Sequence, residues 1–150
     1  MRTYRRTVVT DLEPREVWEY LADFAATDEW DPRARHGRLV EGDGGVGSRY
    51  ETDVHFLGRT TRMAYTVTRL EAPQWIEWVG ENRMVRAHDV IEVRSCGPGS
   101  VVHYASSHEY RVLPALLGWL MSRPLAQLCD EARDGLQETL DRHAAGRSGV

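Results

Sequence analysis

Two residues in the second half of the chain, Asp89 and His108, carry side chains that can exchange protons near neutral pH. Both lie in segments with alternating apolar and polar residues, 87–94 and 101–111, which are typical of half-buried strands. The charged residues predict the water-facing positions, so the alternation turns Asp89 and His108 inward. The other inward-facing residues of these segments are Ile91, Val93, Val102, Tyr104, Ser106 and Tyr110.

The turn between these two segments decides which residue lies opposite Asp89. A four-residue loop, 97–100, places Asp89 opposite His108 and predicts a hydrogen-bonded pair. A two-residue loop at Gly97-Pro98 would place Ser106 there instead, but Pro98 is incompatible with the positive φ that a type I′ turn needs. We therefore expect the longer loop.

An inward-facing Asp89 needs a partner, because burying an unpaired carboxylate costs several kcal/mol. Together with the hydroxyl group of Tyr65, an Asp89–His108 pair could move protons next to a carbonyl group, as aldol cyclisation and dehydration require. These three residues are the candidates for catalysis. The alternative is structural: Asp89 holds His108 in place and nothing reacts.

The inward faces of the strands are too polar and aromatic for a dry core, which favours a ligand cavity. Trp30 could cover its mouth or simply pack within its loop, and Met121 could adapt its shape to a ligand. The predicted ligand-binding residues are Trp30, Tyr50, Thr52, Val54, Phe56, Met63, Tyr65, Ile91, Tyr104, Ser106, Tyr110, Leu117, Leu120, Met121, Leu125 and Leu128.

The elements that position these residues follow from periodicity. A strand is predicted over 3–10, a short helix from Pro14, and six antiparallel strands within 38–111, joined by turns rich in glycine. Residues 114–143 have the apolar spacing of one long amphipathic helix, with a kink that Pro124 should cause. Residues 144–150 should form a frayed tail. This order predicts one α+β domain, 1–150, in which a curved sheet wraps around the last helix.

Several segments resemble the polyketide cyclase/dehydrase branch of the START-related helix-grip superfamily. They are PREVWEYLADF, EWDP, GVGSRY, YTVTRLEAP, DVIEV and GPGSVVHY, followed by the long helix. The resemblance implies a helix-grip fold of about seven strands, with two helical segments between the first strand and the other six. The superfamily includes cyclases, lipid carriers and hormone receptors, so it implies a hydrophobic or aromatic ligand, of polyketide or lipid type, without identifying catalytic residues.

Bulk properties restrict the other classes of function. The formal charge is −4, with 19 basic and 23 acidic residues among 150, so we expect no nucleic-acid partner. Neither the histidine spacing nor Cys96 and Cys129 match a metal site, and we expect no cofactor. With no signal peptide or apolar run of about 18 residues, the protein should be cytoplasmic with no membrane span. A homodimer through an edge strand, a non-catalytic carrier and a protein-interaction module with a filled interior remain alternatives.

Overall fold

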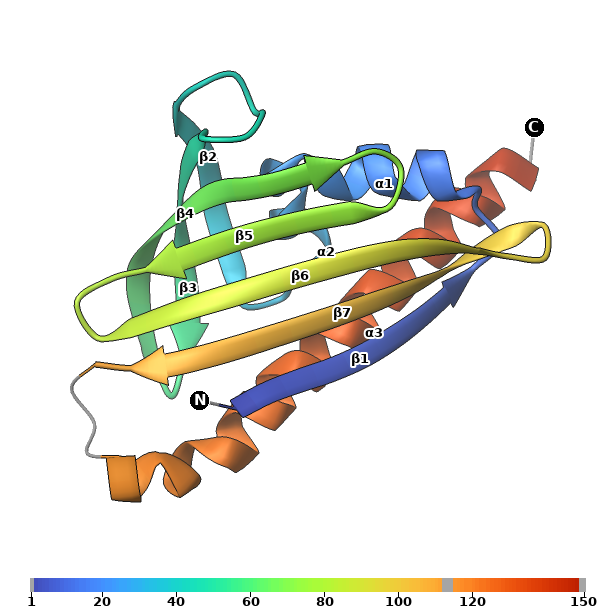
Figure 1. The fold of residues 1–150 in the computed structure, drawn as a ribbon. Coiled ribbons are helices and arrows are strands. Elements are labelled where there is room, and N and C mark those ends of the chain that lie inside the picture. Colours follow the sequence, from blue (N-terminus) through green and yellow to red (C-terminus); the bar gives the residue numbers. More distant parts are fainter. Residues whose placement is uncertain (1, 112–114, 149–150) are drawn as a thin grey trace.

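The computed structural model describes residues 2–111 and 115–148, without the side chains of 115–117, and it contains one antiparallel sheet. The seven strands lie in the order β1-β7-β6-β5-β4-β3-β2 (Figure 1). The strands are β1 (Arg2–Thr10), β2 (Ala34–Glu41), β3 (Arg49–Phe56), β4 (Arg59–Glu71), β5 (Trp75–Glu81), β6 (Val85–Cys96) and β7 (Gly99–Tyr110). The helical segments are α1 (Pro14–Ala22), η1 (Phe24–Ala26), α2 (Thr27–Trp30), η2 (Ala115–Met121) and α3 (Ser122–Ser148). The predicted helix-grip fold is confirmed.

The long helix α3 lies along one face of the curved sheet and contacts β1 (Figure 1). Its buried residues recur every three or four positions, so they form one continuous stripe against the sheet. They include Leu125, Cys129, Ala132, Leu136 and Leu140. Each fully buried leucine contributes roughly 1.5–3 kcal/mol of transfer free energy, which makes this stripe a main support of the fold. No helix in the described part of the chain is both long enough and apolar enough to span a membrane.

The break predicted near Pro124 coincides with a change of helix type. The 3-10 helix η2 ends at Met121, and α3 begins at Ser122. Pro124 therefore lies in the first turn of α3, where its missing N–H group removes no helical hydrogen bond. Pro114, the predicted start, lies outside the described residues. The helix also continues to Ser148 instead of fraying after His143, and Arg147 pairs there with Glu16 of α1.

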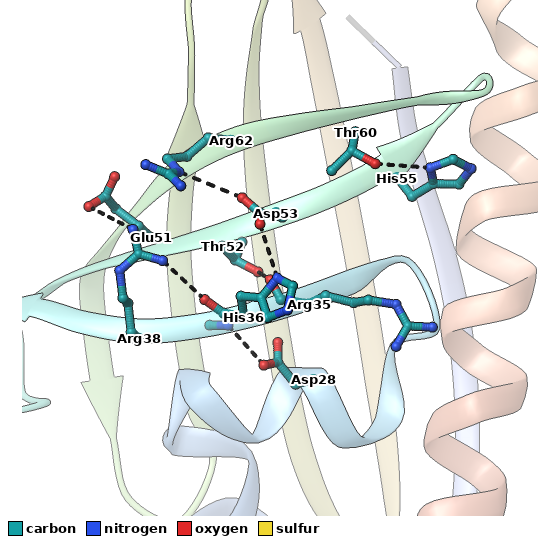
Figure 2. A network of polar contacts seen from close by, with 11 residues as sticks. Asp28, Arg35, His36, Arg38, Glu51, Thr52, Asp53, His55, Thr60 and Arg62 are labelled. Carbon is teal, nitrogen blue, oxygen red and sulfur yellow. Dashed lines mark hydrogen bonds and ion pairs between the residues drawn. The ribbon is translucent and has the colours of Figure 1, made fainter.

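Trp30 was expected in a loop between α1 and the next strand, and this was wrong, because the stretch after α1 is helical. It forms η1 and α2, and β2 begins at Ala34, before the predicted strand region. Figure 2 shows how α2 is fastened to the sheet edge: an Asp28 carboxylate oxygen accepts a hydrogen bond from the Gly37 N–H at 2.8 Å. The Thr52 hydroxyl donates to the Arg35 carbonyl at 3.1 Å, across an irregular part of the β2–β3 ladder. The first contact holds α2 against β2, and the second joins β2 to β3.

The turn between β6 and β7 also differs from the prediction. Cys96 pairs with Gly99, so the loop has two residues and Asp89 lies opposite Ser106. Proline is excluded only from a type I′ turn, which needs positive φ at both central residues. Gly97 alone has positive φ, +57°, as a type II′ turn requires, and the negative φ of proline suits the second position.

Candidate functional site

A cavity of about 450 Å³ lies between the sheet, α2 and the first turns of α3. Most of the residues predicted to bind a ligand line it. They are Trp30, Thr52, Val54, Phe56, Met63, Tyr65, Tyr104, Ser106, Tyr110, Met121, Leu125 and Leu128, together with Asp89 and His108. The strand alternation therefore identified the face of the sheet on which the cavity lies.

Three of the predicted ligand-binding residues that the structure describes do not line the cavity. Tyr50 and Ile91 are buried in the core, where the Tyr50 ring packs against Phe24 with centroids 5.2 Å apart. Leu120 is 49% exposed at the end of η2. The side chain of Leu117 lies outside the described part of the chain. Sharing a face of the sheet with the cavity is thus not sufficient, because position along the strand decides between core and cavity.

Asp89 lies on the cavity wall, buried at the centre of β6. Its Oδ1 atom accepts hydrogen bonds from the Ser106 hydroxyl at 2.5 Å and the Tyr104 hydroxyl at 3.3 Å. The predicted hydrogen bond with His108 is wrong, because the two-residue turn places Ala87 opposite His108. Burial raises the pKa of Asp89, against the opposing effect of His108 and the two hydroxyl donors.

His108 lies on β7 and faces the same cavity. Its buried Nδ1 atom has no hydrogen-bond partner among the described residues. Burial lowers its pKa, and the neighbouring Asp89 only partly offsets this. At neutral pH the imidazole is therefore uncharged, with one ring nitrogen able to accept a proton.

Tyr65 is positioned by a glycine on the neighbouring strand. Tyr65 on β4 pairs with Gly80 on β5, and a Cβ atom at Gly80 would lie 2.4 Å from the Tyr65 ring. The ring therefore lies directly over the glycine backbone and packs against Phe24 at 4.6 Å. Burial raises the pKa of Tyr65, and that of Tyr104, well above the ordinary value, so both hydroxyl groups stay protonated and can donate hydrogen bonds.

A second cavity carboxyl group, that of Asp31, was missed by the sequence analysis. Asp31 follows α2, and its Oδ1 atom accepts a hydrogen bond from the Arg33 N–H at 2.9 Å. Burial, supported by the charge of Asp89, raises the pKa of Asp31 to about 6. Trp30 also belongs to α2 and is 3% exposed, so it packs into the wall and does not lie in a loop over the mouth. The spacing of Thr27, Trp30 and Asp31 at i, i+3 and i+4 could have indicated this helix face.

Two further polar atoms on the cavity wall lack hydrogen-bond partners within the described residues. They are Thr27 Oγ1 and Trp78 Nε1, in side chains that are 6% and 2% exposed. Trp78 pairs with Asp89 across β5 and β6, so the two side chains share the inward face. An unsatisfied buried polar group costs about 1–3 kcal/mol. Both residues line the cavity, so a bound molecule would lie next to these unsatisfied groups.

The cavity opens at one end of the molecule. Two of its lining residues, Leu57 and Met84, are 57% and 44% exposed. They lie in the turns between β3 and β4 and between β5 and β6, which Figure 1 shows at the same end as η2. A molecule entering here would pass apolar side chains before it reaches Asp89 and Asp31.

Residues 1–141 match the family described as polyketide cyclase/dehydrase and lipid transport. No curated protein matches the sequence. Similar solved structures include a protein from Thermus thermophilus, with a TM-score of 0.78 and 15% identity over 93% of this chain and 97% of that one. The Zhui aromatase/cyclase from a Streptomyces species has a TM-score of 0.76 and 13% identity, over 93% of each chain.

A START superfamily protein from Mycobacterium smegmatis is also similar, with a TM-score of 0.72 and 15% identity over 96% of this chain and 97% of that one. At these identities the structural likeness establishes the fold alone. The family match, in contrast, spans nearly the whole chain. The protein therefore belongs to the polyketide cyclase/dehydrase and lipid transport family, and it shares the fold of the START superfamily protein.

Proposed function

We propose that the protein binds a hydrophobic or aromatic small molecule, of polyketide or lipid type, between the sheet and α3. The cavity carries this proposal: its volume is about 450 Å³, and its walls are mainly aromatic and aliphatic. Small-molecule sites have volumes of roughly 300–1,000 Å³, whereas a protein that only docks a partner could fill this space with side chains. The family and the likeness to an aromatase/cyclase support the same type of ligand.

Binding of a neutral aromatic probe, 2-naphthylmethanol, tests the proposal through the fluorescence of Trp30 and Trp78, which both line the cavity. Ala87→Phe should weaken binding at least tenfold, because Ala87 lines the cavity and is only 2% exposed. The matched control is Ala105→Phe on β7. It adds the same ring on the face of the sheet that points away from the cavity, so it should leave binding unchanged. Equal affinities in all three proteins, or no binding to the unaltered protein, would contradict the proposal.

The unpartnered His108 Nδ1 atom supports a second candidate function, cyclisation or dehydration of such a molecule. Neutral His108 could accept a proton from the carbon next to a carbonyl group whose oxygen accepts a hydrogen bond from Tyr65. A protonated Asp89 could donate a proton to a departing hydroxyl group, which leaves as water. The raised pKa of Asp89 and the lowered pKa of His108 favour these protonation states.

A β-hydroxy ketone with a naphthyl group, 4-hydroxy-4-(2-naphthyl)butan-2-one, tests this candidate. Its dehydration gives a conjugated enone, whose absorbance reports the rate. His108→Ala and Asp89→Asn should abolish turnover and leave the affinity within about tenfold. No acceleration by the unaltered protein, or an unchanged rate in both variants, would leave only the binding function.

A further inference from the structure

The deep end of the cavity contains two carboxyl groups that form no ion pair with a basic side chain of the described residues. Asp31 approaches from the end of α2 and Asp89 from β6, and both line the cavity. Trp30, next to Asp31, packs edge-on against Tyr104 at 6.2 Å, and the Tyr104 hydroxyl donates to Asp89. The charges of Asp31 and Asp89 both raise the pKa of Tyr65 and of Tyr104, so the two carboxyl groups belong to one cluster. Over residues 2–111 and 115–148, no ion pair joins either of them to an arginine or histidine.

The basic groups near this cluster are engaged or uncharged. Arg33 pairs with Glu131 of α3 at 2.5 Å, so its charge is already balanced. His108 is neutral at pH 7 because burial lowers its pKa. Arg59, which also lines the cavity, is exposed in the β3–β4 hairpin, near the mouth. The deep end consequently has a negative potential, which opposes an anionic ligand and favours a cationic one.

The surrounding atoms suit a small cation. The Thr27 side chain is only 6% exposed and its hydroxyl is unpartnered, on the same helix as Trp30, so its oxygen can accept a hydrogen bond from a ligand. The aromatic rings of Trp30, Tyr65 and Tyr104 line the same space, and the face of an aromatic ring attracts an ammonium group. Carboxylates, a hydroxyl oxygen and aromatic faces are the groups that recognise amines in proteins.

We infer that the cavity selects a ligand whose apolar body carries a protonated amine, bound between Asp31 and Asp89. This inference rests on the proposed function and adds the charge of the ligand to it. The ammonium group donates hydrogen bonds to the Asp31 carboxylate, to a carboxyl oxygen of Asp89 and to Thr27 Oγ1, while the apolar body extends toward Leu57 and Met84 at the mouth.

Binding of the amine should depend on pH. Burial raises the pKa of Asp31 to about 6, so acidification to pH 5 protonates this group and weakens the attraction. The charged and titratable groups near the two carboxyl groups come from every element packed around them. They are Arg33, Glu131, His88, His108, Tyr65, Tyr104, Cys129 and Arg6.

Three probes with one ring system test the inference: 2-naphthylmethylamine, 2-naphthylmethanol and 2-naphthoate. At pH 7.5 the amine should bind at least tenfold more tightly than the alcohol, and the naphthoate most weakly. Asp31→Asn should remove most of the preference for the amine, since asparagine keeps an oxygen for the Arg33 N–H but loses the charge. Asp134→Asn, which removes an exposed carboxylate of α3, is the matched control and should keep the preference.

The outcomes distinguish a failure of the amine inference from a failure of the proposed binding function. If the alcohol binds as tightly as the amine, the amine assignment is wrong and the cavity function stands. If the preference survives Asp31→Asn, or if Ala87→Phe leaves amine binding unchanged, the ammonium group does not bind at this site. If none of the three probes binds, both proposals are wrong. Circular dichroism of each variant confirms that it is folded.

Discussion

Replacing Asp31 with asparagine should stabilise the protein at pH 8 and leave its stability at pH 4 unchanged. Burial raises the pKa of Asp31 to about 6 in the folded protein, from the ordinary value of 3.8. The folded state therefore holds the proton more tightly than the unfolded state, and the free energy of unfolding falls as the pH rises from about 4 to above 6. This difference in pKa lowers the free energy of unfolding at pH 8 by about 3 kcal/mol. The variant carries no ionisable group here, so it avoids this cost.

Thermal unfolding at pH 4, 6 and 8 measures the effect. For a domain of this size, about 3 kcal/mol corresponds to a rise in Tm of roughly 6–12 °C at pH 8. The asparagine side chain still offers an oxygen to the Arg33 N–H group, so the local structure should persist. Asp134→Asn, at an exposed carboxylate, should keep the pH dependence of the unaltered protein. A stability difference that is the same at all three pH values would refute the reasoning.

Two further substitutions test how the site is held in place. Ser106→Ala removes the donor at 2.5 Å from Asp89 and should cost about 1.5–3 kcal/mol at pH 8, whereas Ser107→Ala, on the opposite face of β7, should change stability by less than about 0.5 kcal/mol. Gly135→Ala places a Cβ atom 1.9 Å from the Trp30 carbonyl oxygen, so it should push α2 away from α3. It should lower the free energy of unfolding by about 1–3 kcal/mol and weaken ligand binding. Gly146→Ala, in open space on the same helix, should be neutral or stabilise by up to about 1 kcal/mol. Chemical denaturation measures all four, and a matched pair with equal effects would contradict the corresponding contact.

The sequence predicted the fold and one wall of the cavity because the relevant signals are local. Alternation along β6 and β7 correctly turned Asp89 and His108 inward, and the three-and-four spacing identified the face of α3 that packs on the sheet. The partner of Asp89 was predicted wrongly, because it depends on the backbone conformation of one turn. Both type I′ and type II′ turns have two residues, and only the second accepts proline after glycine.

The opposite wall was harder to predict, because long-range contacts position it. Asp31 lies in a polar stretch that looks like a solvated loop, yet an Asp28 hydrogen bond to β2 and the contact of Gly135 with Trp30 press this stretch onto the cavity. Tyr50 illustrates the reverse error. Its inward direction was predicted, but η1 brings Phe24 against it and buries it in the core.

The most direct test of the ligand cavity is a nitrogen-proton NMR titration of the five tryptophan indole groups. On addition of 2-naphthylmethylamine, the Nε1–H signals of Trp30 and Trp78 should shift, because both side chains line the cavity. The signal of Trp18, whose Nε1–H donates to the Trp75 carbonyl outside the cavity, should stay in place. A shift confined to Trp119, which is 63% exposed, or no shift at all would contradict the account.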